Sequence, residues 1–461
     1  MKRTLQDAAR VVSGELIGED RPFGCVSTDS RTLKPGALFV ALRGPNFDGA
    51  AFVQAAAAQG AIGALAERAT PVPLPQVVVS DAQRALQELA RTWRADFSLP
   101  VVAVAGSNGK TTAKEMTAAI LSRMGLCMAT HGNLNNHIGV PVTLMRLEVS
   151  HRSAVIEMGA NAVGDVAALM RVAQPTVGLI TNAGAEHLEG FGNLDGVAKG
   201  EGEAVSCLSP AGTAVINADD AYADYWRGVS GAKRIVTFGI HGRADFAAKN
   251  VFQGIERGEF ATRFTLVSPL GEGAVMLKAG GAHNVGNALA AAAAAGAAGA
   301  SLEDIVLGLA DFRAVAGRLQ LKAGTRGSWI IDDSYNANPS SVRAGLEVLR
   351  ALNGVTWLVL GDMAELGEVS HDSHALIGSY ARECGVKRVF AVGALSSRAV
   401  ETFGSGGEWF ADADSLTRRL QTELAPGVTV LIKGSRINRL ERVVQAVTGG
   451  GAGSGPMMRA S

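Results

Sequence analysis

Cysteine is scarce in this sequence, with only four residues in a chain of 461. The four lie far apart, and none forms a Cys-x-x-Cys pair or another metal-ligand spacing: Cys25, Cys127, Cys207 and Cys384. Small disulfide-stabilised domains and zinc modules depend on closely spaced cysteines. The scarcity therefore argues against both classes and predicts free thiols in a reducing compartment.

Excess charge and long apolar runs are also missing. Lysine plus arginine and aspartate plus glutamate number 43 each, so no overall field attracts nucleic acid or an anionic membrane. No run approaches about 18 apolar residues without charge. The opening MKRTLQDAARVV lacks the apolar core of a signal peptide. We therefore expect a soluble, cytoplasmic protein that neither inserts into membranes nor binds nucleic acid.

The sequence does contain apolar strands that alternate with helix-compatible segments. VVAVAG, SAVIEMGA, PTVGLITNAGA and GTAVINADD form one such series, and WIIDDSY, TWLVLGDM, RVFAVGA and VTVLIKGS form a second. Continuous apolar strands between helices indicate mostly parallel sheets covered on both faces. We expect an α/β protein with a central sheet like that of P-loop ATPases and a carboxyl-terminal, Rossmann-like doubly wound sheet.

The length suggests about three domains, and shorter strands such as ALFVAL and QVVV indicate a small α/β domain before the first series. We predict an amino-terminal domain over residues 1–97, a central domain over 98–314 and a carboxyl-terminal domain over 315–448. The remaining residues 449–461, rich in glycine and serine, predict a flexible tail.

The segment VVAVAGSNGKTTAKEM has the order strand, glycine turn, helix, which is typical of a phosphate-binding loop. Gly106 and Gly109 permit a tight turn with inward backbone N–H groups. Lys110 can reach outer phosphates and Thr111 can ligate Mg²⁺. The generic motif would need glycine at position 104, where Val104 stands, so a chance glycine turn is the alternative. The predicted loop comprises Gly106, Ser107, Asn108, Gly109, Lys110, Thr111 and Thr112.

Further segments recur in a characteristic order along nearly the whole chain. They are STDSRTLKPGALFVALRGPNFDG, HGNLNNHIGVPVTLMRL, AVIEMGAN, NAGAEHLEGFG, GAHNVGNALAA, DDSYNANPSS, LGDMAELG and VLIKGSR. With the GSNGKTT loop, this set resembles the Mur ligases. DSYNANP and GDMAELG resemble most the members that join D-alanyl-D-alanine to a UDP-N-acetylmuramoyl-tripeptide (UDP-MurNAc-tripeptide) in peptidoglycan synthesis.

The resemblance implies a peptide ligase that uses ATP and Mg²⁺ and acts as a monomer. In this family the substrate carboxylate attacks the γ-phosphate of ATP, and the incoming amine then attacks the resulting acyl phosphate. Such a site holds anions together and positions the amine rather than doing covalent chemistry. The third residue of the tripeptide, meso-diaminopimelate or lysine, stays open.

Glu157 follows an apolar strand, where a carboxylate is costly unless it is paired or metal-bound. The resemblance assigns it to Mg²⁺ together with His187, and it makes both of them, with Lys110 and Arg318, catalytic residues. A helix-capping or salt-bridged carboxylate and an ordinary histidine are the alternatives.

The segment VAKGEGE departs from the family pattern VAKAKGE, whose second lysine carries a carbamate. Glu201 stands at that position, and Lys199 matches the first lysine. Because a glutamate is a shorter carboxylate of the same charge, we predict that Glu201 replaces the carbamate as a catalytic metal ligand, directly or through water. Two alternatives stay open, namely carbamylation of Lys199 and a solvated helical Glu201.

The resemblance also assigns nucleotide and substrate contacts. It gives Asn284 to the adenine, with a helix N-cap as the alternative. It gives Asp333 to the ribose and Arg318, at the joint before the last domain, to a phosphate. The predicted substrate-binding residues are Ser30, Arg31, Asn46, Asn133, Asn136, Tyr335, Asn336, Asn338 and Lys433. Plain turns are the alternative for the asparagines, an orienting contact from Asp29 is the alternative for Arg31, and a surface lysine is the alternative for Lys433.

Two other functions fit parts of the sequence. Another ligase of the family, adding a diamino acid or extending a folate with glutamate, is the first alternative. The absence of a DNPR segment argues against the diamino-acid enzyme, and the amino-terminal domain argues against the folate enzyme. A nucleotide-dependent switch is the second alternative, but the chain lacks the guanine-selective NKxD pattern.

Overall fold

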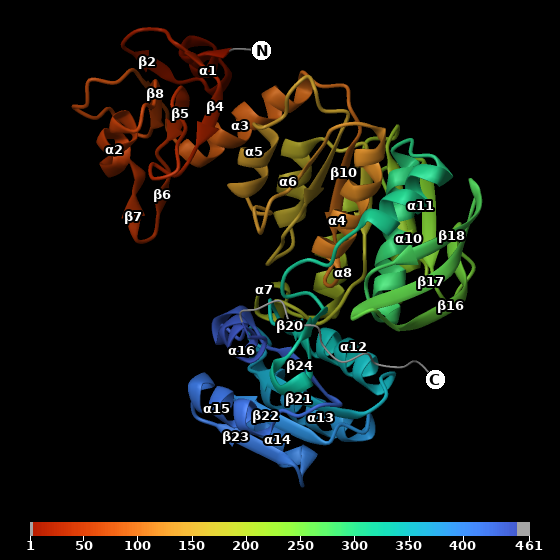
Figure 1. Cartoon of the computed structure of the whole chain (residues 1–461). Coiled ribbons are helices and arrows are strands. Elements are labelled where there is room, and N and C mark those ends of the chain that lie inside the picture. Colours follow the sequence, from red (N-terminus) through yellow and green to blue (C-terminus); the bar gives the residue numbers. More distant parts are fainter. Residues whose placement is uncertain (1–2, 450–461) are drawn as a thin grey trace.

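The computed structural model describes residues 3–449, which form three α/β domains around separate sheets (Figure 1). This confirms the expected fold class. The predicted boundaries at residues 97 and 314 stay predictions. All but the first residue of the predicted tail, 450–461, lies outside the described residues. No helix among residues 3–449 is both long and apolar enough to cross a membrane.

The amino-terminal domain has a five-stranded sheet with the order β2-β9-β8-β5-β4. Its strands are β2 (Glu15–Ile17), β4 (Cys25–Ser27), β5 (Ala37–Val40), β8 (Gly63–Ala66) and β9 (Gln76–Val78). Its helices are α1 (Leu5–Val12), α2 (Val53–Ala58) and α3 (Ala82–Ala95). Two short pairs accompany the sheet, β1 (Arg3–Thr4) with β3 (Pro22–Phe23), and β6 (Arg43–Gly44) with β7 (Phe47–Asp48).

Helix α3 joins this domain to the next one. Asp81 caps its first turn by accepting from the Arg84 N–H, and one face of the helix is buried. The Trp93 indole donates to the Leu147 carbonyl at 3.1 Å, and Arg94 Nε donates to the Ala173 carbonyl at 3.1 Å. The helix therefore packs on the central domain, and Figure 1 shows it next to α5 (Gly139–Leu144).

The central sheet has nine strands in the order β11-β12-β10-β13-β14-β15-β16-β17-β18. The first seven are parallel: β10 (Val101–Ala105), β11 (Cys127–Ala129), β12 (Ser153–Glu157), β13 (Val177–Ile180), β14 (Thr213–Asn217), β15 (Arg234–Gly239) and β16 (Phe246–Glu256). Strands β17 (Glu259–Ser268) and β18 (Gly271–Leu277) add an antiparallel edge. The predicted strand series is confirmed, and β11 and β15 to β18 were not anticipated.

Helices cover both faces of this sheet. Along β10, Val101, Ala103 and Ala105 join one hydrophobic core, and Val102 and Val104 join the other, as the two-residue period of a strand requires. The first core includes α5, α6 (Asp165–Ala173), α8 (Leu194–Ser206) and α9 (Ala223–Val229), with α7 (Leu188–Phe191) beside α8. The second includes α4 (Lys110–Leu121), α10 (Ala282–Ala297) and α11 (Leu302–Asp311).

The carboxyl-terminal sheet has the order β19-β20-β24-β21-β22-β23, with only β19 antiparallel. Its strands are β19 (Gln320–Ala323), β20 (Trp329–Asp333), β21 (Val355–Gly361), β22 (Arg388–Val392), β23 (Gly407–Phe410) and β24 (Val428–Lys433). Helices α12 (Pro339–Arg350), α13 (Ser370–Glu383) and α14 (Ser397–Phe403) cover one face, and α15 (Ala413–Glu423) and α16 (Glu441–Val447) cover the other. The doubly wound prediction is confirmed.

The strand order places the site. From β10 the chain moves outward to β11 and β12 on one side and returns to β13 on the other. Ligands of parallel sheets bind at such a reversal, outside the carboxyl ends of the strands. The turns that follow β10, β12 and β13 meet there, facing the carboxyl-terminal domain (Figure 1).

Candidate active site

The phosphate loop begins at the end of β10, and its two glycines are required by backbone geometry. Gly106 has φ +117° and Gly109 has φ +84°. A Cβ atom on Gly106 would lie 2.2 Å from Thr181 Oγ1, and one on Gly109 would lie 2.2 Å from Asn287 Oδ1. Val104 is still within the strand and packs in the core, so the loop needs no glycine at that position.

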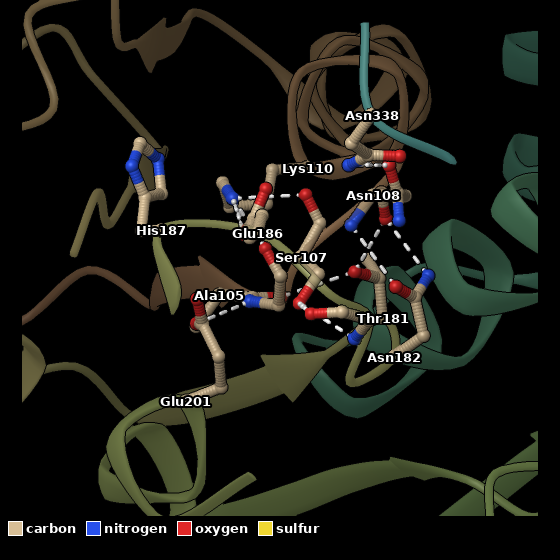
Figure 2. Close-up of polar contacts among 12 residues, drawn as sticks. Ala105, Ser107, Asn108, Lys110, Thr181, Asn182, Glu186, His187, Glu201 and Asn338 are labelled. Atoms are coloured by element: carbon tan, nitrogen blue, oxygen red, sulfur yellow. Dashed lines mark hydrogen bonds and ion pairs between the residues drawn. The ribbon is translucent and has the colours of Figure 1, made fainter. Parts of the chain in front are cut away.

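The end of β13 holds the loop in shape (Figure 2). The Thr181 hydroxyl donates to the Asn108 carbonyl at 2.7 Å. The Asn182 amide donates to the same carbonyl at 2.9 Å and accepts from the Asn108 N–H at 3.0 Å. Ser107 and Gly184 exchange hydrogen bonds. The loop is therefore pre-organised for an anion, with support from residues that the sequence analysis did not single out.

Lys110 folds back onto its own loop. Its ammonium donates to the Gly106 carbonyl, to the Ser107 carbonyl at 3.2 Å and to Glu186 Oε1 at 3.2 Å. Burial lowers the pKa of Lys110, but Glu186, Glu201 and Glu157 together raise it above the ordinary value. Lys110 is therefore a charged lysine among carboxylates, available to a phosphate that displaces Glu186.

Glu186 was not anticipated, although it directly precedes the predicted His187. Burial raises the pKa of its carboxyl, and Lys110 opposes that shift. Sequence offers only a weak signal for this residue, because its partner lies 76 positions away.

Glu157 and Glu201 are buried carboxylates with one unsatisfied oxygen each. Glu157 Oε1 accepts from the Asn135 amide at 2.9 Å, and Glu201 Oε2 accepts from the Gly106 N–H at 2.6 Å. Within residues 3–449, Glu157 Oε2 and Glu201 Oε1 have no hydrogen-bond partner. Burial raises the pKa of Glu201 to about 7, with the neighbouring Glu186 adding to the shift and Lys110 opposing it. Buried acceptor oxygens without donors suit a cation such as Mg²⁺.

The exposed fractions of two side chains decide between the alternatives for the VAKGEGE segment. Glu201 is 0% exposed, so it is not a solvated helical residue. Lys199 is exposed on the opposite side of α8, away from the loop. Figure 2 shows Glu201 beneath the loop beside Ala105. Its role as a substitute for the carbamate stays a prediction.

The four predicted metal ligands do not all line the same cavity. A cavity of about 390 Å³ is lined by Thr111, Glu157 and His187, whereas Glu201 is not among its lining residues. His187 Nδ1 lies 2.5 Å from Glu365 Oε2 of the carboxyl-terminal domain. In the part of the chain that the structure describes, no three His, Cys, Asp or Glu side chains form a ready ligand group.

A second cavity, of about 490 Å³, lies between the central and carboxyl-terminal domains. It is lined by Asn108, Gly109 and Thr112 of the loop and by Asn284, Arg318 and Asp333. The N-cap of α10 is Gly281, so Asn284 is not the cap; its amide donates to the Gly280 carbonyl at 2.7 Å. Its predicted adenine contact stays a prediction. His283 also lines this cavity, and burial lowers its pKa to about 4, which keeps the ring neutral.

Asp333 and Lys433 form a buried ion pair at the end of neighbouring strands. Lys433 Nζ lies 2.6 Å from Asp333 Oδ2 and donates to the Asn336 carbonyl at 2.9 Å. Lys433 is 3% exposed, so it is not a surface lysine. Burial lowers the pKa of Lys433, and Asp333 opposes that shift.

The carboxyl-terminal domain touches the phosphate loop directly. The Asn338 amide donates to Asn108 Oδ1 at 2.9 Å, and the Asn108 amide donates to Ser340 Oγ at 3.0 Å. Asn338 is also the N-cap of α12, with Pro339 in the first turn. The Arg318 guanidinium lies 4.3 Å from the centre of the Tyr335 ring. Figure 2 shows Asn338 against Asn108.

Two predicted substrate-binding asparagines, Asn133 and Asn136, are poorly placed for that role. Asn136 lines the smaller cavity, but its oxygen accepts from the Ile138 and Gly139 N–H groups, and Asn133 is exposed. The neighbouring Asn135, which bonds Glu157, was missed.

The predicted residues of the amino-terminal domain, Ser30, Arg31 and Asn46, line neither cavity. Asp29 does orient Arg31, through hydrogen bonds of 2.9 and 2.7 Å, and Arg31 lowers the pKa of that carboxyl to about 2. Asn46 lies in the exposed turn between β6 and β7, as its turn alternative expects. Contacts of these residues with the UDP end of a substrate stay predictions.

Three family models match this chain. They are the Mur ligase family catalytic domain over residues 22–95, the Mur ligase middle domain over 104–295 and the Mur ligase glutamate ligase domain over 317–436. The chain is 44% identical over 447 residues to the UDP-N-acetylmuramoyl-tripeptide–D-alanyl-D-alanine ligase of Escherichia coli strain K12, covering 96% of this chain and 98% of that protein.

Solved structures show the same likeness over all three domains. A crystal structure of MurF from Acinetobacter baumannii superposes with a TM-score of 0.89 at 35% identity, covering 96% of this chain and 98% of that one. MurF ligase from Thermotoga maritima, in complex with ADP, gives a TM-score of 0.80 at 28% identity, covering 91% and 96%.

Proposed function

The chain belongs to the Mur ligase family, and we propose that it is the ATP-dependent ligase that joins D-alanyl-D-alanine to UDP-MurNAc-tripeptide in peptidoglycan synthesis. The observation that carries this function is the likeness to ligases of that name along 96% of the chain. The DSYNANP segment supports it, because Asn338 of that segment lies against the phosphate loop.

ATP occupies the cavity between the two larger domains in this proposal. The loop cradles its phosphates with backbone N–H groups, and Asp333 and Asn284 line the part that would hold the nucleoside. The ADP complex of the Thermotoga relative supports the use of ATP.

The reaction forms an amide in two steps. A carboxylate oxygen of the tripeptide attacks the γ-phosphorus of ATP, the bond to the β–γ bridging oxygen breaks, and ADP is released. The amine of the dipeptide then attacks the acyl carbon and loses a proton, and inorganic phosphate leaves. Lys110 remains charged and stabilises the transferred phosphoryl group once that group takes the place of Glu186.

We propose Mg²⁺ as the metal, held by Glu157 with Thr111 and His187 around the smaller cavity. The ion would neutralise phosphate charge. Glu201 acts from beneath the loop, where it fixes the Gly106 N–H. Glu365 contacts Nδ1 of His187, which leaves Nε2 for the ion, so this contact holds the ring in orientation and need not break.

The proposal extends to the state of the protein in the cell. Both substrates and ATP are small, water-soluble molecules, so we propose that the protein works in the cytoplasm, and we propose a monomer because the family resemblance implies one. Ser30, Arg31 and Asn46 are proposed to face the UDP end of the tripeptide substrate, and the third residue of that tripeptide is to be found by experiment.

A phosphate-release assay tests this function. Release should require ATP, UDP-MurNAc-tripeptide and D-alanyl-D-alanine together, and the assay should be run with both tripeptide types. Replacing the dipeptide with a diamino acid or with glutamate separates the other ligases of the family. Slow release with nucleotide alone, unaffected by both substrates, would contradict the proposal and favour a switch.

A further inference from the structure

The turn after β24 carries an arginine that the proposed reaction does not use. Arg436 begins a short 3₁₀ turn, Arg436–Asn438, and its guanidinium lies 5.8 Å from the centre of the Tyr335 ring. Tyr335 lines the cavity that also holds Glu157 and Lys110. Two guanidinium groups, from Arg318 and Arg436, therefore lie near the ring of this cavity-lining tyrosine, and Arg436 itself stands outside the lining of both cavities.

The other cations of the site are already engaged on the phosphate side. Lys433 is buried against Asp333, and Lys110 lies on the phosphate loop. Arg318 lines both cavities, including the larger one to which the proposed function assigns ATP.

Arg436 differs from these three cations. Its side chain is 65% exposed, and its only ion-pair partner among the described residues is Glu441 at 3.6 Å. Such an exposed pair contributes little to stability and is easily exchanged for another anion.

The backbone around Arg436 is nevertheless firmly held. The Ser435 N–H donates to the Asp362 carbonyl at 3.0 Å, and the Ser435 hydroxyl donates to the Ala337 carbonyl at 3.2 Å. The Asn438 amide donates to the Asp362 carbonyl at 2.8 Å. The turn is thus tied to the segment that carries Tyr335, so Arg436 is presented from a rigid base, which lowers the entropic cost of binding.

We propose that Arg436 and Tyr335 form the subsite for the free carboxylate of the incoming dipeptide. This inference rests on the proposed function. The dipeptide presents an amine, which must reach the acyl carbon, and a carboxylate, which needs a cation away from the phosphates. A guanidinium matches a carboxylate with two parallel hydrogen bonds. The Tyr335 ring offers an apolar surface to the alanine methyl groups. The dipeptide carboxylate is thereby assigned to Arg436 rather than to Lys433, which is among the predicted substrate-binding residues.

A substitution combined with a modified substrate tests the subsite. R436M should raise the KM for D-alanyl-D-alanine by about 10- to 100-fold, the range of a lost charge-assisted hydrogen bond. The KM values for ATP and tripeptide should stay unchanged. D-alanyl-D-alaninamide, which lacks the negative charge, should be a poor substrate for wild type by a similar factor. R436M should treat dipeptide and amide alike. R439M, at an exposed arginine of the same turn, is the matched control and should behave as wild type.

The outcomes separate this inference from the function on which it rests. If R436M lowers kcat/KM by the same factor for dipeptide and amide, so that the wild-type preference for the dipeptide persists, or if wild type itself accepts both equally, the subsite is wrong while the ligase function stands. If wild type makes no amide bond, the function is wrong. In that case, calorimetry can still test the subsite by measuring the binding of dipeptide and amide in the presence of a non-hydrolysable ATP analogue and the tripeptide. If the dipeptide and the amide bind equally, or if neither binds, the subsite is wrong.

Discussion

Asn108 of the phosphate loop and Asn338 of the carboxyl-terminal domain are joined by a hydrogen bond of 2.9 Å. The two residues are 230 positions apart. The Asn338 side chain donates to the loop through its amide and caps α12 through its oxygen. Through this pair the position of the carboxyl-terminal domain is coupled to the loop that we propose holds the phosphates of ATP.

We expect N338A to lose stability and activity for separable reasons. The loss of an N-cap costs about 1 kcal/mol of unfolding free energy. The loss of the Asn108 contact should in addition lower kcat/KM for ATP. S301A removes the equivalent capping box of α11, outside both cavities, and should lower stability alone. N338S keeps a capping oxygen but should not reach Asn108. Thermal unfolding and steady-state kinetics of the three variants check this, and full activity of N338S would contradict the coupling.

We expect G106A to abolish most activity. The added Cβ would meet Thr181 Oγ1 at 2.2 Å in a backbone conformation that alanine avoids, so the loop must shift, and a shift of about 1 Å can cost about 100-fold in rate. G132A is the control, because Gly132 also has a positive φ, +57°, but no atom within 4 Å of the added Cβ. Its activity should stay near that of wild type.

We expect activity to be independent of bicarbonate. Glu201 already carries the carboxylate that relatives obtain by modifying a lysine, so E201A should lose about tenfold or more of kcat. K199R removes the one lysine of that segment that could be carbamylated while it keeps the positive charge, and this variant should be fully active. Assays in degassed and bicarbonate-supplemented buffer check this. The idea fails if E201A matches wild type while E201K is rescued by carbon dioxide.

We expect Glu201 to make the protein without nucleotide and metal less stable as pH rises. Its pKa in the fold is about 7, above the ordinary value of 4.5, so the folded state holds this proton more tightly than the unfolded state. Its contribution is therefore complete below pH 4.5 and is lost as pH rises through about 7. Denaturant unfolding of wild type and E201Q across this range measures the difference. Parallel stability curves would show that Glu201 titrates normally.

We expect the carboxyl-terminal domain to move as a rigid body when ATP binds. Its hydrogen bonds and ion pair with the central domain at the site are those of Asn338 and Ser340 with Asn108 and of Glu365 with His187, whereas Phe260 of β17 packs in its hydrophobic core. Solution scattering should therefore change on adding an ATP analogue and tripeptide, with the internal structure of the domain retained. Unchanged scattering curves would count against closure.

The sequence by itself determined the local elements and the loop. Gly106 and Gly109 are required by φ angles that a turn of this shape imposes, and β10, β12, β20 and β24 follow from mostly apolar runs. These features depend on neighbouring residues only, so pattern and composition predict them. The resemblance of ordered motifs then supplied the function, which the full-length relatives bear out.

Only the tertiary structure decided which side chains meet. Glu186, Asn135, Thr181 and Asn182 support the site from turns that the sheet order brings together, and no local pattern distinguishes them from other polar residues. Two lysines that each precede a glycine in the sequence lie in opposite environments, because Lys433 is buried and Lys199 is exposed. The physical reason is that burial and pairing depend on contacts between strands and domains far apart in the chain, and these contacts form only when the sheets assemble.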